Sequence, residues 1–314
     1  MAQFQWQFDA PTGVYKSHAL SKRLYQAAVE KATFVDHVRP VEGFGKKQGD
    51  TVTLTRVSRI TEPTSGKLTE GTRISEDTFA LTTTSITVSE YGRAVPFTSL
   101  GDDLSFFDLE NPIQQKLVEQ QKLVLDAAAA TQFKNAKIKY VPTGLAANNI
   151  TTNGTAGASA TANLNLWHVE QICDYLFDTL FAPTLEGDEY IGIFRTLGLR
   201  GIKQDPAWDE WHKYTDPQAK YTGEVGKLEG IRFIETNHNA ALGKVGTSSV
   251  LGSGVVFGAD AVAMAEVLTP ELRAAIPSDF GRSKAVAWYG ILEFGIIWDT
   301  GNAGQARIVH MTST

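Results

Sequence analysis

The feature that most constrains this 314-residue chain is a long β-arm over residues 49–97. Residues 51–57 (TVTLTRV) alternate threonine with mostly apolar side chains, the period-two pattern of a strand with one covered face. A polar tract follows, and residues 79–91 form a second β-rich run. Because a two-stranded hairpin alone is only marginally stable in water, we expect the arm to rest on another copy of the chain. From these residues, an ordinary hairpin with a flexible loop in a mixed domain remains equally open.

A long helix is predicted after the arm. Asn111 is a good N-cap residue, and Pro112 suits the first helical position. From there the apolar period changes to that of a helix, with one stripe formed by Ile113, Leu117, Val124 and Ala128. We predict a helix from Pro112 to about Ala136. The stripe is narrow and ends in small alanines, which is typical of a helix lying across a sheet.

Composition excludes several classes of protein. A hydrophobic content of 42% and a charged content of 20% are typical of a folded protein, and no apolar run approaches membrane-spanning length. Cys173 is the single cysteine, so no intrachain disulfide framework exists, and we expect folding in a reducing, intracellular environment. The formal net charge is −6 without a block of basic residues, which argues against tight, direct nucleic-acid binding.

The remaining segments alternate helix and strand signals. We predict helices at residues 17–38 and 165–181, a flexible loop at 148–163 that separates two lobes, and short strands at 190–194, 231–235 and 255–257. Near the end, residues 285–298 and 305–311 are predicted as two strands joined by a Gly/Asn turn at 299–304.

Signals for catalytic chemistry are weak. The six histidines lack metal-ligand spacing, and the phosphate-loop-like GEVGK at residues 223–227 has the wrong glycine spacing. Asp102 and Asp103 precede a predicted helix, where adjacent carboxylates are usually solvated. An aromatic group near Asp205 has the spacing of a packed helical turn, although it offers a stacking surface; it consists of Trp208, Trp211 and Tyr214. We therefore predict no catalytic, cofactor-binding or metal-binding residue.

The order and spacing of several motifs carry a family resemblance. They are GDTVT at residues 49–53, LTEG at 68–71, TVSEYG at 87–92, YTGEVGKLEGIRFIETN at 221–237, VFGADA at 256–261 and KAVAWYG at 284–290. With them, the chain resembles the major capsid proteins of tailed bacteriophages with the Hong Kong 97-type shell fold. More specifically, it resembles the coat-protein family of the large podophages that carry a virion RNA polymerase. The resemblance covers residues 40–300.

The resemblance implies an α+β fold, the Hong Kong 97-type capsid fold, with an N-terminal arm, an extended β-hairpin loop, a peripheral domain with a long spine helix and an axial α/β domain. The implied boundaries are 1–48 for the N-terminal arm and helix, 49–98 for the hairpin loop, 99–163 for the peripheral domain, 164–258 for the axial domain and 259–314 for returning strands of both domains. The glycines of residues 223–227 then form a tight structural turn beside a strand.

The implied function is a coat protein, not an enzyme, that self-assembles as hexamers and pentamers into an icosahedral shell around double-stranded DNA, with weak, non-specific contact to the DNA. Inter-subunit contacts are expected from charged residues of the arm, whose alternative role is that of a solvated loop; they are Lys67, Glu70, Arg73, Glu76 and Asp77. We expect no cofactor and no isopeptide cross-link through Lys67.

Further implied partners are a portal, a decoration protein and either a separate scaffolding protein or none, with no membrane partner. The implied location is the virion, assembled in the cytoplasm of a bacterial host. Two alternatives remain open. One is an encapsulin, a bacterial compartment shell of the same fold. The other is an oligomeric hydrolase or sugar-binding enzyme, with its site near Asp205 and residues 208–214.

Overall fold

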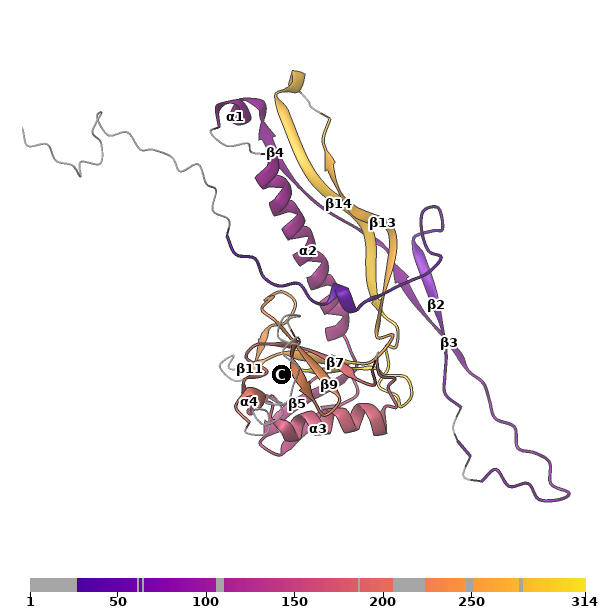
Figure 1. Cartoon of the computed structure of the whole chain (residues 1–314). Helices are drawn as coiled ribbons and strands as arrows, with labels where there is room; N and C mark the ends of the chain where they lie inside the picture. Colours follow the sequence, from indigo (N-terminus) through magenta and orange to yellow (C-terminus); the bar gives the residue numbers. More distant parts are fainter. Residues whose placement is uncertain are drawn as a thin grey trace, which may run out of the picture.

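The computed structural model describes residues 27–60, 62–63, 65–105, 110–185, 187–205, 224–246, 251–276 and 279–314. Three parts are distinct in Figure 1: a domain built on a seven-stranded sheet, a long four-stranded sheet backed by a long helix, and an extended hairpin. The C-terminus lies in the seven-stranded domain, which also contains residues from the middle of the chain.

The seven-stranded sheet has the order β6-β5-β15-β12-β7-β9-β8. Its strands are β5 (Ile138–Gly144), β6 (Ala147–Thr151), β7 (Tyr190–Arg195), β8 (Glu224–Leu228), β9 (Ile231–Thr236), β12 (Gly254–Phe257) and β15 (Ile308–Met311). Helix α3 (Leu166–Asp174) continues into a π-helical turn (Tyr175–Thr179) and packs its apolar side against this sheet. Asn165 caps α3, because its side chain accepts a hydrogen bond from the backbone N–H of His168. Smaller elements of this region are α4 (Arg200–Lys203), β10 (Lys244–Val245) and β11 (Leu251–Gly252).

The four-stranded sheet has the order β1-β13-β14-β4. Its strands are β1 (Arg39–Pro40), β4 (Ser89–Thr98), β13 (Val262–Ala274) and β14 (Ser283–Ile296), with a 3-10 turn (Asp279–Gly281) before β14. Helix α2 (Glu110–Lys134) runs along this sheet, and the short α1 (Ser99–Leu104) lies at its far end (Figure 1). At the other end of α2, Phe133 is fully buried between Phe34 and Phe257. The helix therefore joins the four-stranded sheet to the seven-stranded sheet, because its buried residues share one hydrophobic cluster with Phe294 of β14 and Phe257 of β12.

The extended hairpin pairs β2 (Thr51–Val57) with β3 (Leu81–Thr87) without a register shift. Along β2, exposed threonines alternate with half-buried side chains, as the period-two pattern predicts. The base of the hairpin is anchored by Ile86, which is 3% exposed. Ile86 lies directly against Gly295 of β14, where an added Cβ would come within 2.5 Å of the Ile86 side chain. Glycine is needed there for the close approach.

Several predicted elements are confirmed. The strand at residues 51–57 has the predicted bounds, and the helix at 165–181 and the strands at 190–194, 231–235 and 255–257 are present with small shifts at their ends. Helix α2 begins and ends two residues earlier than predicted. Asn111 lies inside α2 and is therefore not its N-cap.

The predicted helix at residues 17–38 is wrong for the part that the structure describes. Residues 27–34 contain no helix, and only Val35–His37 form a 3-10 turn. The reason is that the backbone N–H groups of Thr33 and Phe34 donate to the Asp126 side chain of α2. Residues 17–26 lie outside the described residues.

Four further predictions need correction. The run at 79–91 is split at Val88, because β4 leaves the hairpin and pairs with β14. Residues 147–151 form β6, so the predicted loop at 148–163 is irregular only from residue 152 on, and it links β6 to α3 within the seven-stranded domain instead of separating two lobes. Strands β14 and β15 belong to different sheets and are not a pair. Within residues 223–227, the described residues 224–227 belong to strand β8, and the turn follows at Glu229 and Gly230, both with positive φ.

Candidate assembly interface

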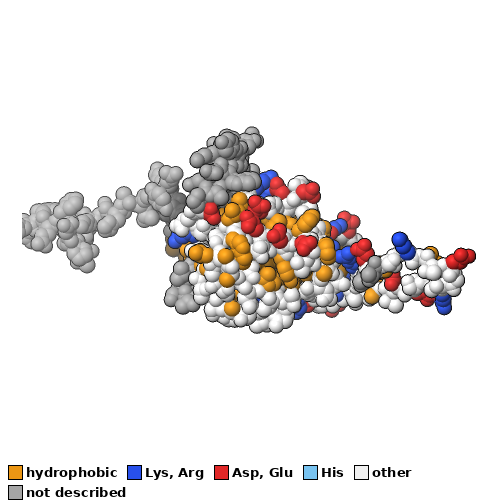
Figure 2. Space-filling model, turned by 90° about the horizontal axis from the view of Figure 1, so that it is seen from below, with side chains coloured by type: hydrophobic (Ala, Val, Ile, Leu, Met, Phe, Trp, Pro, Cys, Tyr) orange, Lys and Arg blue, Asp and Glu red, His pale blue; other side chains and the backbone are white. Residues whose placement is uncertain are grey.

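The distal loop of the hairpin, defined as residues 58–80, is the most exposed part of the fold. A hydrogen bond from Ser58 N–H to the Ala80 carbonyl joins its two ends, and a turn closed by Thr72 N–H and the Thr69 carbonyl lies midway along it. Large apolar side chains on this loop are exposed to solvent; Leu68 is 68% exposed, Ile74 63% and Phe79 62%. Figure 2 shows the loop projecting from the body with charged side chains of both signs. Exposed apolar side chains on a projecting loop are typical of a contact surface.

The five predicted contact residues all lie on this distal loop and are exposed; they are Lys67, Glu70, Arg73, Glu76 and Asp77. Arg73 and Glu76 form an ion pair with side chains 85% and 75% exposed, which adds little stability to the subunit. Their contact with a second subunit stays a prediction.

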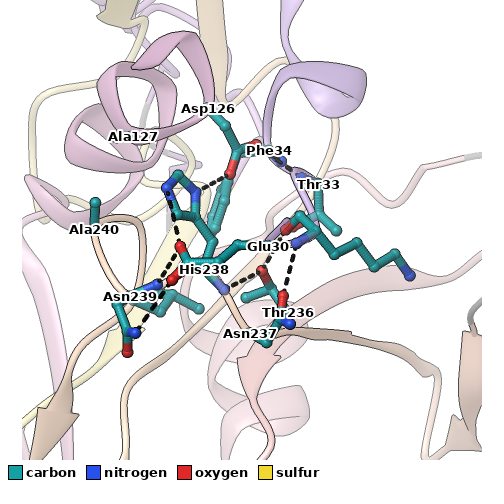
Figure 3. A network of polar contacts seen from close by, with 12 residues as sticks. Glu30, Thr33, Phe34, Asp126, Ala127, Thr236, Asn237, His238, Asn239 and Ala240 are labelled. Atoms are coloured by element: carbon teal, nitrogen blue, oxygen red, sulfur yellow. Dashed lines mark hydrogen bonds and ion pairs between the residues drawn. The ribbon is translucent and has the colours of Figure 1, made fainter. Parts of the chain in front are cut away.

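A buried polar network fixes the segment before the hairpin against α2 (Figure 3). Asp126 is fully buried, and its Oδ1 atom accepts hydrogen bonds from the backbone N–H groups of Thr33 (2.8 Å) and Phe34 (2.6 Å). Its Oδ2 atom lies 2.7 Å from Nδ1 of His238, which is also buried. On the other side of that ring, Glu30 lies 3.7 Å from Nε2 and also accepts from Asn239. The network replaces the helix predicted for this segment, and the sequence contains no spacing signal for it.

A second buried chain of polar groups joins β5, β15 and the residue before β12. Lys139 Nζ donates to the Lys134 carbonyl at the end of α2 and lies 3.0 Å from His310 Nδ1. His310 Nε2 lies 3.1 Å from Ser253 Oγ, which donates to the Met311 carbonyl. Burial lowers the pKa of His310 to about 3 and that of Lys139 to about 8. The Ser253 proton is directed to a carbonyl in a buried strand, so this serine and histidine are arranged as structural hydrogen-bond partners.

Other predicted site features give no reaction centre within the part of the chain that the structure describes. No group of three or more His, Cys, Asp or Glu side chains there is placed to hold a metal ion. Asp102 lies on α1 near Lys284, at 3.6 Å, and Asp103 is exposed on the same helix. The aromatic group at residues 208–214 lies outside the described residues. No described helix has the length and apolar character needed to cross a membrane.

Comparison with solved structures finds the same fold in phage capsids. The capsid of cyanophage Pam1 has a TM-score of 0.66 with 14% identity, over 100% of this chain and 99% of that chain. The head of Helicobacter pylori bacteriophage KHP40 has a TM-score of 0.69 with 12% identity, over 94% of each chain. The capsid of cyanophage P-SCSP1u has a TM-score of 0.65 with 12% identity, over 95% of this chain and 93% of that one.

The structure matches known proteins, whereas the sequence does not. No protein-family model matches the chain, and no curated protein matches it. The structural matches span nearly the full length of both chains, so they concern the whole arrangement of sheets, long helix and hairpin. This chain therefore has the Hong Kong 97-type fold of tailed-phage capsid proteins.

Proposed function

We propose that this chain is a major capsid protein that self-assembles into the icosahedral shell around a tailed phage's double-stranded DNA. The observation that carries the proposal is the extent of the structural match, at least 93% of both chains for each of the three phage capsids described above. The exposed apolar side chains of the distal loop support it, because they offer a surface that the subunit does not cover itself.

The finer parts of the proposal rest on the resemblance in sequence. They are assembly as hexamers and pentamers, a separate scaffolding protein, a portal, a decoration protein, assembly in the host cytoplasm and the absence of catalysis. The narrower kinship to coat proteins of podophages with a virion RNA polymerase stays a prediction. The encapsulin alternative is not favoured, because the three solved structures described above are phage capsids.

Negative-stain electron microscopy tests the proposal directly. The purified chain is imaged alone and after co-expression with its genomic neighbours. Closed shells, or rings of five and six subunits, are the expected result. A uniform dimer or tetramer under both conditions contradicts the proposal and favours the enzyme alternative near Asp205.

A further inference from the structure

A groove rich in arginine lies at the base of the hairpin. It has a volume of about 590 Å³ between β1, β2, β13 and the segment after β14, and Arg39, Arg56 and Arg307 line it. A second hollow of about 500 Å³ adjoins it, shares Arg307 and Trp298 with it and adds Arg59. We call the two hollows together the arginine groove.

Aromatic stacking and backbone carbonyls position three of these four arginines. The guanidinium groups of Arg56 and Arg307 lie 5.8 Å and 5.0 Å from the ring centre of Trp298. Arg59 lies 4.5 Å from the ring centre of Phe181. Arg56 also donates to the Ile297 carbonyl at 3.0 Å, and Arg307 to the Ala259 carbonyl at 2.9 Å. The groups that position Arg56 and Arg59 here are therefore neutral and leave the charge of these two arginines unpaired.

The arginine groove has more positive than negative charge. Its four arginines face two carboxylates, Glu42 and Asp260, which leaves a net charge of +2 in a chain whose net charge is −6. Asp260 forms ion pairs with both Arg39 and Arg307. Among the described residues, no atom accepts a hydrogen bond from the buried Nε–H groups of Arg56 and Arg307. Burial lowers the pKa of Arg307, so its charge is held at a free-energy cost that an anionic partner offsets.

Beyond Arg59, which lines the arginine groove, the distal loop has the complementary character. Residues 62–77 carry four carboxylates and two cations, a net charge of −2; the carboxylates are Glu62, Glu70, Glu76 and Asp77. The loop also exposes Leu68 and Ile74, while the wall of the arginine groove includes half-buried Val52 and Leu54. Both charge and apolar surface on the loop therefore match the arginine groove.

The arginine groove and the distal loop of one chain lie end to end. The groove runs beside β2 to Arg59, and the loop continues from there away from the body (Figure 1). We propose that the arginine groove receives the acidic distal loop of a second copy of this chain. This inference rests on the proposed function. Such a contact joins different surfaces of the two copies, and its repetition closes a ring when the rotation between neighbouring copies divides a full turn evenly.

Charge reversal tests the pairing. One variant, R39E/R59E, reverses two arginines whose side chains are exposed, and a second, E70K/D77K, reverses the loop. Each variant alone is expected to form at least tenfold fewer rings and shells than the wild type, and the quadruple variant is expected to restore them. Circular dichroism of the unassembled subunit checks that each variant is folded. A matched control, K122E/K244E, reverses two exposed lysines outside the groove, and E70K/D77K should not restore any assembly that it loses.

Mixing the two double variants gives a sharper readout. Each chain in the mixture is repelled by its own kind and complementary to the other kind, so neighbours must alternate around a ring. Only a ring with an even number of subunits alternates completely. We therefore expect a 1:1 mixture to form rings of six and almost no rings of five, as counted by electron microscopy.

The outcomes separate this inference from the proposed function. If the wild type forms neither rings nor shells, the proposed function itself fails. If the wild type assembles and folded R39E/R59E assembles equally well, the arginine groove is not the receptor. The pairing is also overturned if the quadruple variant does not regain assembly, or if the mixture forms the same proportion of five-membered rings as the wild type. Both results leave the capsid proposal intact.

Discussion

The seven-stranded domain and the extended hairpin are both β-rich, yet they are stabilised differently. In the domain, α3 and the sheet enclose a continuous core that includes Leu176, Phe233 and Val309, all nearly inaccessible to solvent. Among the residues of the two hairpin strands, β2 and β3, all of which the structure describes, Ile86 is the only buried hydrophobic one. The subunit's own core therefore determines the conformation of the domain, whereas the described residues of the distal loop have no such core, which is why we propose that a second subunit covers this loop.

Deleting residues 64–75 is the strongest test of this contrast. We expect the truncated chain to fold with nearly unchanged thermal stability, because no residue of the deleted segment that the structure describes is buried. Regular shells should be absent. Thermal unfolding and electron microscopy of one preparation measure both properties, and normal particles from the truncated chain contradict the role of the loop.

Truncating a core aromatic side chain should have the opposite effect. Phe133→Ala removes a fully buried ring that lies 4.7 Å from Phe257 and 5.5 Å from Phe34, and we expect a loss of about 3–5 kcal/mol in unfolding free energy. The matched control is Phe79→Ala on the distal loop, which should change the stability of the subunit by less than about 0.5 kcal/mol. Urea denaturation of both variants measures the difference. Equal losses would show that the distal loop is stabilised within the subunit.

The polar network should give an intermediate effect. Asp126→Ala leaves the N–H groups of Thr33 and Phe34 buried without an acceptor, at an expected cost of about 2–4 kcal/mol. Asp126→Asn should cost less, because the amide keeps an oxygen for these donors. Limited proteolysis near residues 27–34 measures the release of the segment. Equal protection in Asp126→Ala and the wild type would show that other contacts anchor it.

A dependence of stability on pH is expected from the seven-stranded domain. Burial lowers the pKa of Lys139 from 10.5 to about 8 and that of His310 from 6.5 to about 3. At pH values between the folded and the unfolded pKa of each group, the unfolded chain binds more protons than the folded chain. Stability therefore rises with pH from about 3 to 6.5 and again from about 8 to 10.5. For Lys139 the rise is at most about 3 kcal/mol.

Two variants assign these changes. Lys139→Met should abolish the rise above pH 8, and His310→Gln should abolish the contribution of His310 below pH 6.5. Urea denaturation from pH 4 to about pH 10 measures both. If the unfolding free energy of the wild type does not change above pH 8, the fold does not lower the pKa of Lys139.

Local patterns predicted much of this fold. The alternation in TVTLTRV predicts β2 because every second side chain meets the same covered face, and the helical spacing of apolar residues in 165–181 predicts α3. The helix predicted over residues 27–34 is wrong because their alanines favour a helix, while the backbone N–H groups of Thr33 and Phe34 donate to Asp126, 92 or more positions away. The distal loop and its charged residues were located from sequence. The arginine groove was not, because Arg39, Arg56 and Arg307 come from three distant segments.

Strand β14 has a mechanical consequence that follows from its length. Its 14 residues extend about 45 Å, from the hairpin base at Gly295 to the end of the sheet beside α1. A strand of this length that tilts as one body would act as a lever. A tilt of about 5° at its base moves the far end by about 4 Å, which is comparable to the spacing between neighbouring strands. Small adjustments where the hairpin meets β14 would thereby be magnified at the opposite end of the molecule, and in the proposed shell this would let one fold serve positions of different curvature.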